Sequence, residues 1–232
     1  MKISKLFALV VLCASCKKSH ESYQDLYSKA DKKLTEIEYL IKKSSCNNLG
    51  NWQIDTVIDG QGRYKYFPVD NLIKNDYNKL KDAYVVLLDA AQKADTRPKL
   101  AYTIAPEVHF EVGCIDGHSK VLLTTDFTVE QVRERLNTSL TTLETFYTNP
   151  SCDGANNWST LPIVKDCTLK YVLHQVGGDS ENQVSFNLKY RQYKALSSKL
   201  AQLDPNYVKC DNMLLAPQKD VTCEKNIPLI KD

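Results

Sequence analysis

The cysteines are the residues of this chain whose type and spacing bear most directly on chemistry. A thiol can close a disulfide bond, bind zinc or act as a nucleophile. Eight cysteines are present, and beyond residue 16 no two of them have the close spacing that the ligands of a zinc site usually show. We therefore expect disulfide bonds, in one of many possible connectivities, among Cys46, Cys114, Cys152, Cys167, Cys210 and Cys223.

The first residues of the chain predict export. Lys2 and Lys5 are followed by the apolar run Leu6–Leu12, which is too short to span a bilayer because a spanning helix needs about 20 residues. A basic start, a short apolar stretch and the small residues Ala14 and Ser15 are typical of a secretory signal. Export places the cysteines in an oxidising compartment, which favours disulfides over free thiols.

The residues around Cys16 resemble the bacterial lipobox, in which small residues precede a cysteine that receives a lipid and becomes the first residue of the mature protein. The resemblance implies a signal peptide over residues 1–15, a lipidated tether over 16–21 and attachment to the membrane through Cys16. Lys17 follows that cysteine in place of an aspartate, which implies the outer membrane of the cell envelope. The alternative is an ordinary cleaved signal with a free cysteine nearby.

Charge and motifs exclude several function classes. The chain has 30 Lys and Arg against 28 Asp and Glu, and because Lys2 and Lys5 lie in the signal, the mature chain is formally neutral. It has no basic field for nucleic acid, and no apolar run after the signal is long enough to span a membrane. The G-x-S-x-G, H-E-x-x-H, P-loop and G-x-G-x-x-G motifs are absent, so we expect no cofactor and no enzymatic activity.

Two phrases of the sequence predict an internal repeat. The pattern S-C-x-x-x-x-N-W occurs at Ser45–Trp52 and again at Ser151–Trp158, and these contain the only two tryptophans. Ala105-Pro106 precedes Cys114 as Ala216-Pro217 precedes Cys223. The copies are offset by roughly 106 to 111 residues, which predicts repeat domains over residues 22–123 and 126–230.

Hydrophobic periodicity gives both copies the same order of elements, namely helix, β-hairpin, helix and β-ribbon, an α+β arrangement. In the first copy the helices begin at the caps Ser22 and Asp70, and strands are expected over 52–58, 63–69, 108–114 and 120–123. In the second copy Thr128 caps the first helix, the second helix carries Phe186 to Leu203, and strands are expected over 158–164, 168–176, 221–223 and 228–230.

The repeat also narrows the cysteine pairing. Cys46 and Cys114 of the first copy correspond to Cys152 and Cys223 of the second, whereas Cys167 and Cys210 have no counterpart. Two cysteines that are missing together are expected to bond together, because the loss of one alone would leave a reactive thiol. The predicted bonds are 46–114, 152–223 and 167–210.

The second copy, written as Cys152…Trp158…Cys167…Tyr171…Cys210-Asp211…Ala216-Pro217…Val221-x-Cys223, resembles a group of uncharacterised bacterial envelope lipoproteins. Their repeat reads C…W…C-G-G…Y…S-D-C…P-P…V-x-C-x-x-G. Thr168 and Leu169 replace the two glycines after Cys167, and the first copy lacks the inner cysteines. The resemblance implies the disulfide-stapled fold and carries no activity.

Candidate ligands for a metal ion alternate along one predicted strand. Glu107, His109 and Glu111 should point to the same face, and imidazole with carboxylate can bind zinc or another divalent ion. The competing interpretation, which we prefer, is a solvated strand face with no metal. His118 lies in the following turn, and His174 is expected to be a half-buried strand residue.

Tyr64 and Tyr66 share a strand face in the first copy, and exposed tyrosines are favoured at protein interfaces. We predict a lipid-anchored, non-enzymatic module, for example of the immunity or inhibitor type, that binds a protein partner through these two residues. One alternative is a structural or accessory subunit of an outer-membrane complex. A second is a carbohydrate-binding protein or a hydrolase whose site has no recognised motif.

Overall fold

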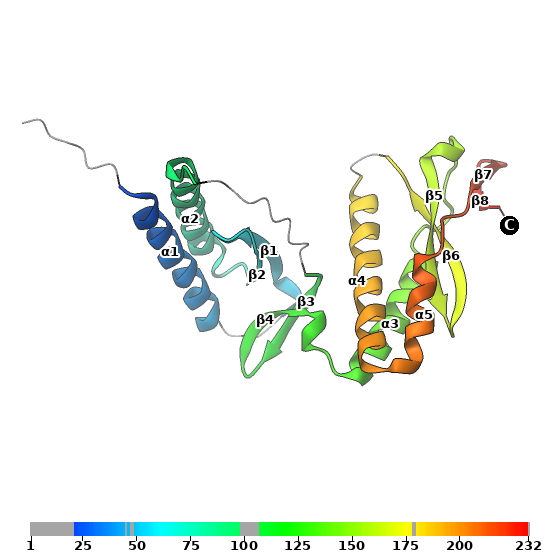
Figure 1. Ribbon diagram of the computed structural model, residues 1–232, viewed down its shortest axis with the longest axis horizontal. Helices are drawn as coiled ribbons and strands as arrows, with labels where there is room; N and C mark the ends of the chain where they lie inside the picture. The colour runs from blue at the N-terminus through cyan, green and yellow to red at the C-terminus, as the bar shows by residue number, and fades with distance from the viewer. Residues whose placement is uncertain (1–20, 45, 47–48, 98–106, 178–179, 232) are drawn as a thin grey trace, which may run out of the picture.

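The computed structural model describes residues 21–44, 46, 49–97, 107–177 and 180–231, and they form an α+β fold of helices and antiparallel hairpins (Figure 1). The α-helices are α1 (Tyr23–Lys43), α2 (Lys74–Ala94), α3 (Val129–Glu144), α4 (Glu181–Leu203) and α5 (Val208–Asn212). The paired strands are β1 (Gln53–Ile58) with β2 (Tyr64–Val69), β3 (His109–Ile115) with β4 (His118–Leu123), β5 (Trp158–Lys165) with β6 (Thr168–Gln175), and β7 (Val221–Glu224) with β8 (Ile227–Ile230).

Two of the predicted helix caps form, and a third acts differently. The Ser22 hydroxyl accepts a hydrogen bond from the Asp25 N–H, and Thr128 exchanges hydrogen bonds with Gln131 in a capping box. The Asp70 carboxylate accepts from the Leu72 and Ile73 N–H groups at 3.0 and 2.9 Å. It therefore closes a turn, and α2 begins later than predicted, at Lys74.

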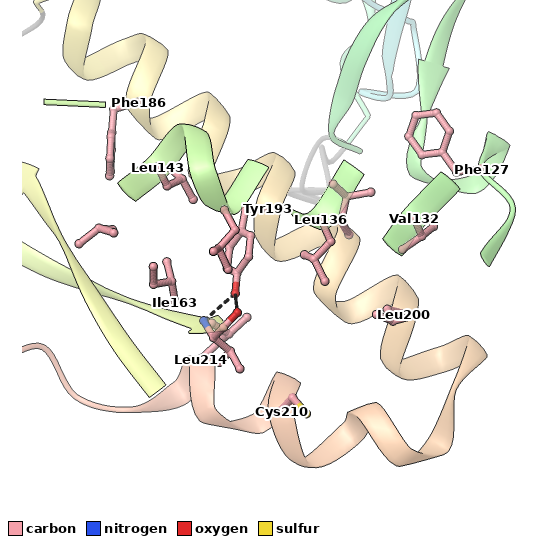
Figure 2. Close-up of a cluster of buried hydrophobic side chains, with 14 residues drawn as sticks. Phe127, Val132, Leu136, Leu143, Ile163, Phe186, Tyr193, Leu200, Cys210 and Leu214 are labelled. Carbon is pink, nitrogen blue, oxygen red and sulfur yellow. Dashed lines mark hydrogen bonds between the residues drawn. The ribbon is translucent and has the colours of Figure 1, made fainter. Parts of the chain in front are cut away.

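The described residues form two hydrophobic cores. The first lies between α1, α2 and the β1–β2 hairpin and consists of Ala30, Leu34, Ile37, Ile41, Val57, Phe67, Val69, Tyr77 and Tyr84. The second is larger and gathers side chains of α3, α4, α5 and the β5–β6 hairpin around Tyr193 (Figure 2). In both cores a pair of helices buries its apolar faces against one hairpin, which is the layered arrangement expected of amphipathic elements.

Tyrosines on the second helix of each core form hydrogen bonds to backbone groups at the outer edge of the neighbouring hairpin. The Tyr84 hydroxyl donates to the Ile58 carbonyl at 2.9 Å, and the Tyr190 hydroxyl donates to the Pro162 carbonyl at 3.0 Å. The Tyr193 hydroxyl accepts from the Val164 N–H at 2.7 Å and donates to the Val164 carbonyl at 3.2 Å (Figure 2). These contacts pair backbone groups of β1 and β5 that no strand reaches.

The structure contains three disulfide bonds. They are Cys46–Cys114, Cys152–Cys223 and Cys167–Cys210, the pairs expected from the sequence. The first joins the segment after α1 to β3, the second joins the segment before β5 to β7, and the third joins the β5–β6 turn to α5. Because each bond links elements distant in sequence, each restricts the unfolded chain.

The β3–β4 hairpin lies between the two cores (Figure 1). Phe110 and Leu122 pack against the second core, with the rings of Phe110 and Phe127 edge to face at 5.1 Å. The Gln192 side chain of α4 donates to the His109 carbonyl at 2.8 Å. A disulfide joins this hairpin to the segment that follows α1, and the hairpin packs on the second core, so it connects the two parts.

Candidate functional site

A groove of about 400 Å³ lies between α1, β2 and β4. Its walls include the aromatic and apolar side chains of Ile41, Tyr64, Tyr66 and Val121. The two tyrosines that the sequence singled out therefore lie in one cavity, and His118 lines the same cavity. The groove is formed by elements of the first core together with the connecting hairpin, so the sequence positions involved span residues 38 to 123.

The two tyrosines of β2 have different environments. The Tyr64 side chain is 39% exposed. Tyr66 is half-buried, its hydroxyl donates to the Glu107 carbonyl at 2.6 Å, and its ring lies 4.7 Å from the ring of His109. Burial, reinforced by Glu107, raises the pKa of the Tyr66 phenol, so it remains a neutral donor at neutral pH. Tyr66 thus lines the groove and also fixes the start of β3.

The opposite wall is β4. The side chains of Ser119 and Val121 are buried, at 7% and 4% exposure, and the Ser119 hydroxyl has no hydrogen-bond partner in the part of the chain that the structure describes. The exposed Lys120 side chain turns away to Asp126, with the charged atoms 2.5 Å apart. The wall therefore presents backbone and small side chains to the groove rather than long charged ones.

The groove has a small excess of positive charge. Three lysines, Lys42, Lys65 and Lys120, line it together with Glu38, but Lys120 turns away and pairs with Asp126. Lys65 pairs with Glu38 at 2.7 Å, whereas Lys42 makes no ion pair with any described residue. A negatively charged ligand would therefore be attracted to this side of the molecule.

The register of the hairpins determines which backbone groups face the groove. The Asp59 N–H donates to the Arg63 carbonyl at 2.9 Å, and hydrogen-bonded pairs alternate with non-bonded pairs along an antiparallel ladder. The opposed pairs Ile58–Tyr64 and Thr56–Tyr66 are therefore non-bonded. Consequently the N–H and C=O groups of Tyr64 and Tyr66 point away from β1, toward the free edge of β2.

The same reasoning applies to β4. The Asp116-Gly117 turn has positive φ at both residues, as a two-residue type I′ hairpin requires, so the flanking pair is hydrogen-bonded. The next pair, Cys114–Ser119, is then non-bonded, and so is Val112–Val121. The outward backbone groups of Ser119 and Val121 make no backbone hydrogen bond to another element among the described residues.

The candidate metal ligands Glu107, His109 and Glu111 do not form a common site. The Arg135 guanidinium pairs with Glu111 at 2.5 Å, and Glu107 accepts from the Thr125 hydroxyl at 3.2 Å. The His109 ring packs against the Tyr66 ring at a tilt of 43°. The strand begins only at His109, and its register shifts between His109 and Val112, which interrupts the predicted alternation. Within the described ranges no group of three or more His, Cys, Asp or Glu side chains could hold a metal ion.

His174 is half-buried on β6, as predicted. Its Nε2 lies 3.0 Å from the Asn187 side-chain oxygen, and its ring stacks on Phe186 at 5.3 Å. Burial lowers the pKa of this imidazole, although the bond to Asn187 opposes the shift. His174 therefore belongs to the packing of the second core and not to the groove.

Some residues of the groove had no signal in the sequence. Ser119 is a polar residue in a short strand, and Lys42 lies among several lysines near the end of α1. The burial of Ser119 follows from its place opposite Cys114 in the hairpin, which the structure shows. Cys16, the predicted lipidation site, lies outside the described residues, and in those that are described no helix is both long and apolar enough to cross a membrane.

Comparison with known proteins gives no further assignment. No protein-family model, no curated protein and no solved structure matches the chain. The groove therefore has to be interpreted from its own residues.

Proposed function

We propose that the protein is a lipid-anchored envelope protein that binds a protein partner in the groove between α1, β2 and β4, without enzymatic activity. The single observation that carries the proposal is the groove itself, in which Tyr64 and Tyr66 meet two buried residues of β4 and Lys42, a lysine that has no ion pair within the described part of the chain. Tyrosines are enriched at protein-binding surfaces and among the residues that contribute most to binding there.

The N-terminal residues support the envelope location. A basic start, a short apolar run and small residues before Cys16 favour lipidation of that cysteine after removal of residues 1–15. The lipid would hold the protein at the bacterial outer membrane, since no polybasic segment is present to bind the membrane surface by itself.

We further propose that the two halves are tandem copies of one disulfide-stapled unit. Support comes from the shared S-C-x-x-x-x-N-W phrase and from the order of elements, which is helix, hairpin, helix and hairpin on both sides of residues 124–126. The copy that contains the groove lacks the inner disulfide of the other. A copy that is freed of one constraint is the one expected to specialise.

Site-specific photo-crosslinking in cells tests the proposal. A photoreactive amino acid at position 64 should crosslink the full-length protein to one dominant partner protein, because the Tyr64 side chain is exposed at the groove. A matched probe at Leu215, which is 79% exposed on the second unit, should not. Equal crosslinking at the two positions, or none at position 64, would contradict the proposed binding site.

A further inference from the structure

A second cleft, of about 400 Å³, lies between α3, α4 and β3. From Gln131 to Thr142, α3 lines this helix cleft with polar residues at the i, i+3, i+4 and i+7 spacing of one helical face. Lys189 and Gln192 of α4 form the other side. The volume falls within the range of about 300–1,000 Å³ that is usual for small-molecule sites, and none of these residues lines the groove beside Tyr64.

Two planar polar side chains are already held in place at the helix cleft. Gln192 is 5% exposed, and its side-chain amide donates to the His109 carbonyl at 2.8 Å. The Arg135 guanidinium pairs with Glu111 at 2.5 Å and lies 4.3 Å from the centre of the Phe127 ring. Side chains that are fixed before binding lose little conformational freedom when a ligand arrives, which favours affinity.

The charges of the helix cleft balance. Arg135 and Glu111 neutralise each other, and the cleft contains one further residue of each sign, Glu134 and Lys189. Neither of these two forms an ion pair with a described residue. An anion would lie beside Glu134 and a cation beside Lys189, and an apolar ligand would remove water from both charges at a large cost. An uncharged ligand with many hydrogen-bonding groups would satisfy both.

Short hydroxyl side chains line the middle of the helix cleft. Thr138 and Thr142 donate to carbonyls of their own helix at 3.1 and 2.9 Å, which leaves each hydroxyl oxygen free to accept. The Ser139 hydroxyl makes no hydrogen bond within the part of the chain that the structure describes. Each of the three can therefore accept a hydrogen bond from a hydroxyl group of a ligand.

The corresponding positions of the first unit carry different side chains. When α1 and α3 are aligned at their N-caps, Ser22 and Thr128, the counterparts of the three hydroxyl residues are Lys32, Lys33 and Glu36. Lys33 and Glu36 form an ion pair with each other at 2.7 Å. The second unit thus has short uncharged groups where the first has long charged ones, which leaves room between its helices.

We infer that the helix cleft binds a neutral carbohydrate, either a mono- or disaccharide or the end of a glycan chain. A sugar ring has hydroxyl groups around its rim that both donate and accept hydrogen bonds, so Glu134 can accept from it, Lys189 can donate to it, and Ser139 can do either. The C–H face of the ring packs on Phe110, which lines the same cleft and is half-buried. This site goes beyond the proposed function, since α3 and α4 form most of it and it shares no residue with the groove.

The experiment uses the full chain in a detergent without a sugar headgroup, such as lauryldimethylamine oxide, on an array of neutral and charged glycans. We expect neutral glycans to bind. For the neutral glycan with the strongest signal, isothermal titration calorimetry then compares two matched variants of α3. Ser139→Lys places in the cleft the side chain that the first unit has at Lys33, and it should weaken binding about tenfold or more.

The control variant is Asn137→Lys. It adds the same charge to the same helix, at an exposed position that does not line the cleft, and should bind within about twofold of the wild type. If Ser139→Lys melts well below Asn137→Lys, the test passes to Lys189→Met. Lys189 is exposed, so this variant is expected to fold, and the loss of the ammonium donor should weaken binding about tenfold.

The outcomes separate carbohydrate binding from other uses of the helix cleft. Absence of binding to any glycan, equal affinity of Ser139→Lys and Asn137→Lys, or a preference for charged glycans would overturn the inference. Glycylglycine, a zwitterion, is titrated in parallel. Its binding in place of glycans would show that Glu134 and Lys189 select a dipolar ligand, and would overturn the inference as well. Crosslinking at position 64 does not depend on these results, so the proposed function stands or fails separately.

Discussion

Removal of one hydroxyl group from the centre of the second core tests the account of how β5 is held. Tyr193 is fully buried and Val164 is 3% exposed, and the Tyr193 hydroxyl bonds both the N–H and the C=O of Val164. In Tyr193→Phe both backbone groups would remain buried without this partner. A buried unsatisfied group costs about 1–3 kcal/mol, so we expect the free energy of unfolding to fall by about 2–3 kcal/mol.

The matched control is Tyr190→Phe on the same helix. The Tyr190 hydroxyl makes one bond, to the Pro162 carbonyl, and Tyr190 is half-buried, so its loss should cost about 1 kcal/mol or less. In a chain of this length, the melting temperature of Tyr193→Phe under non-reducing conditions should be about 4–12 °C below that of the wild type. Equal melting temperatures for the two variants, or a change below about 1 °C for Tyr193→Phe, would refute the reasoning.

Three further predictions concern the lipid, the disulfides and pH. A clickable fatty acid should label the wild type and not Cys16→Ala in cells, and equal labelling of both would exclude the anchor. Replacement of Cys46 and Cys114 by alanine opens a loop of 68 residues and should lower the free energy of unfolding by about 4 kcal/mol in the chain-entropy model, measured by urea denaturation. Burial, with Arg191 nearby, lowers the pKa of His109 below its usual 6.5. The folded state therefore favours the neutral imidazole, and the free energy of unfolding should decline as the pH falls below 6.5. His109→Gln should flatten that decline in melting curves taken across this range, and an unchanged decline would show that His109 is not responsible.

Hydrophobic periodicity was sufficient to predict the main elements. The helices that carry Leu34, Tyr84 and Leu200 and the four hairpins all occur. Long amphipathic segments are predictable because their buried residues recur at a regular spacing in the sequence. The five-residue helix α5 was not predicted, since a segment as short as Val208–Asn212 has no period to detect. It forms after the 3₁₀ turn at Pro205 and is held by the disulfide of Cys210.

The candidate site was predictable only in part. Tyr64 and Tyr66 could be placed on one strand face by alternation, but the partner wall could not, because β4 reaches β2 through tertiary packing that no local pattern specifies. The three candidate metal ligands, Glu107, His109 and Glu111, do not lie together for a related reason. Alternation predicts one face only while the ladder is regular, and the register shift after His109 interrupts the strand that carries Glu111.

Under the proposed lipid anchor at Cys16, the direction of α1 would determine how far the groove lies from the membrane. The helix begins at Tyr23, close in sequence to the proposed anchor, and its Ile41 lines the groove near the other end (Figure 1). At about 1.5 Å per residue these positions are roughly 27 Å apart along the axis. With the lipid on Cys16, α1 acts as a rigid spacer nearly as long as a bilayer is thick. Under the proposed anchor, and with α1 directed away from the membrane, a segment that binds in the groove would come from a freely diffusing protein or project well beyond the headgroups.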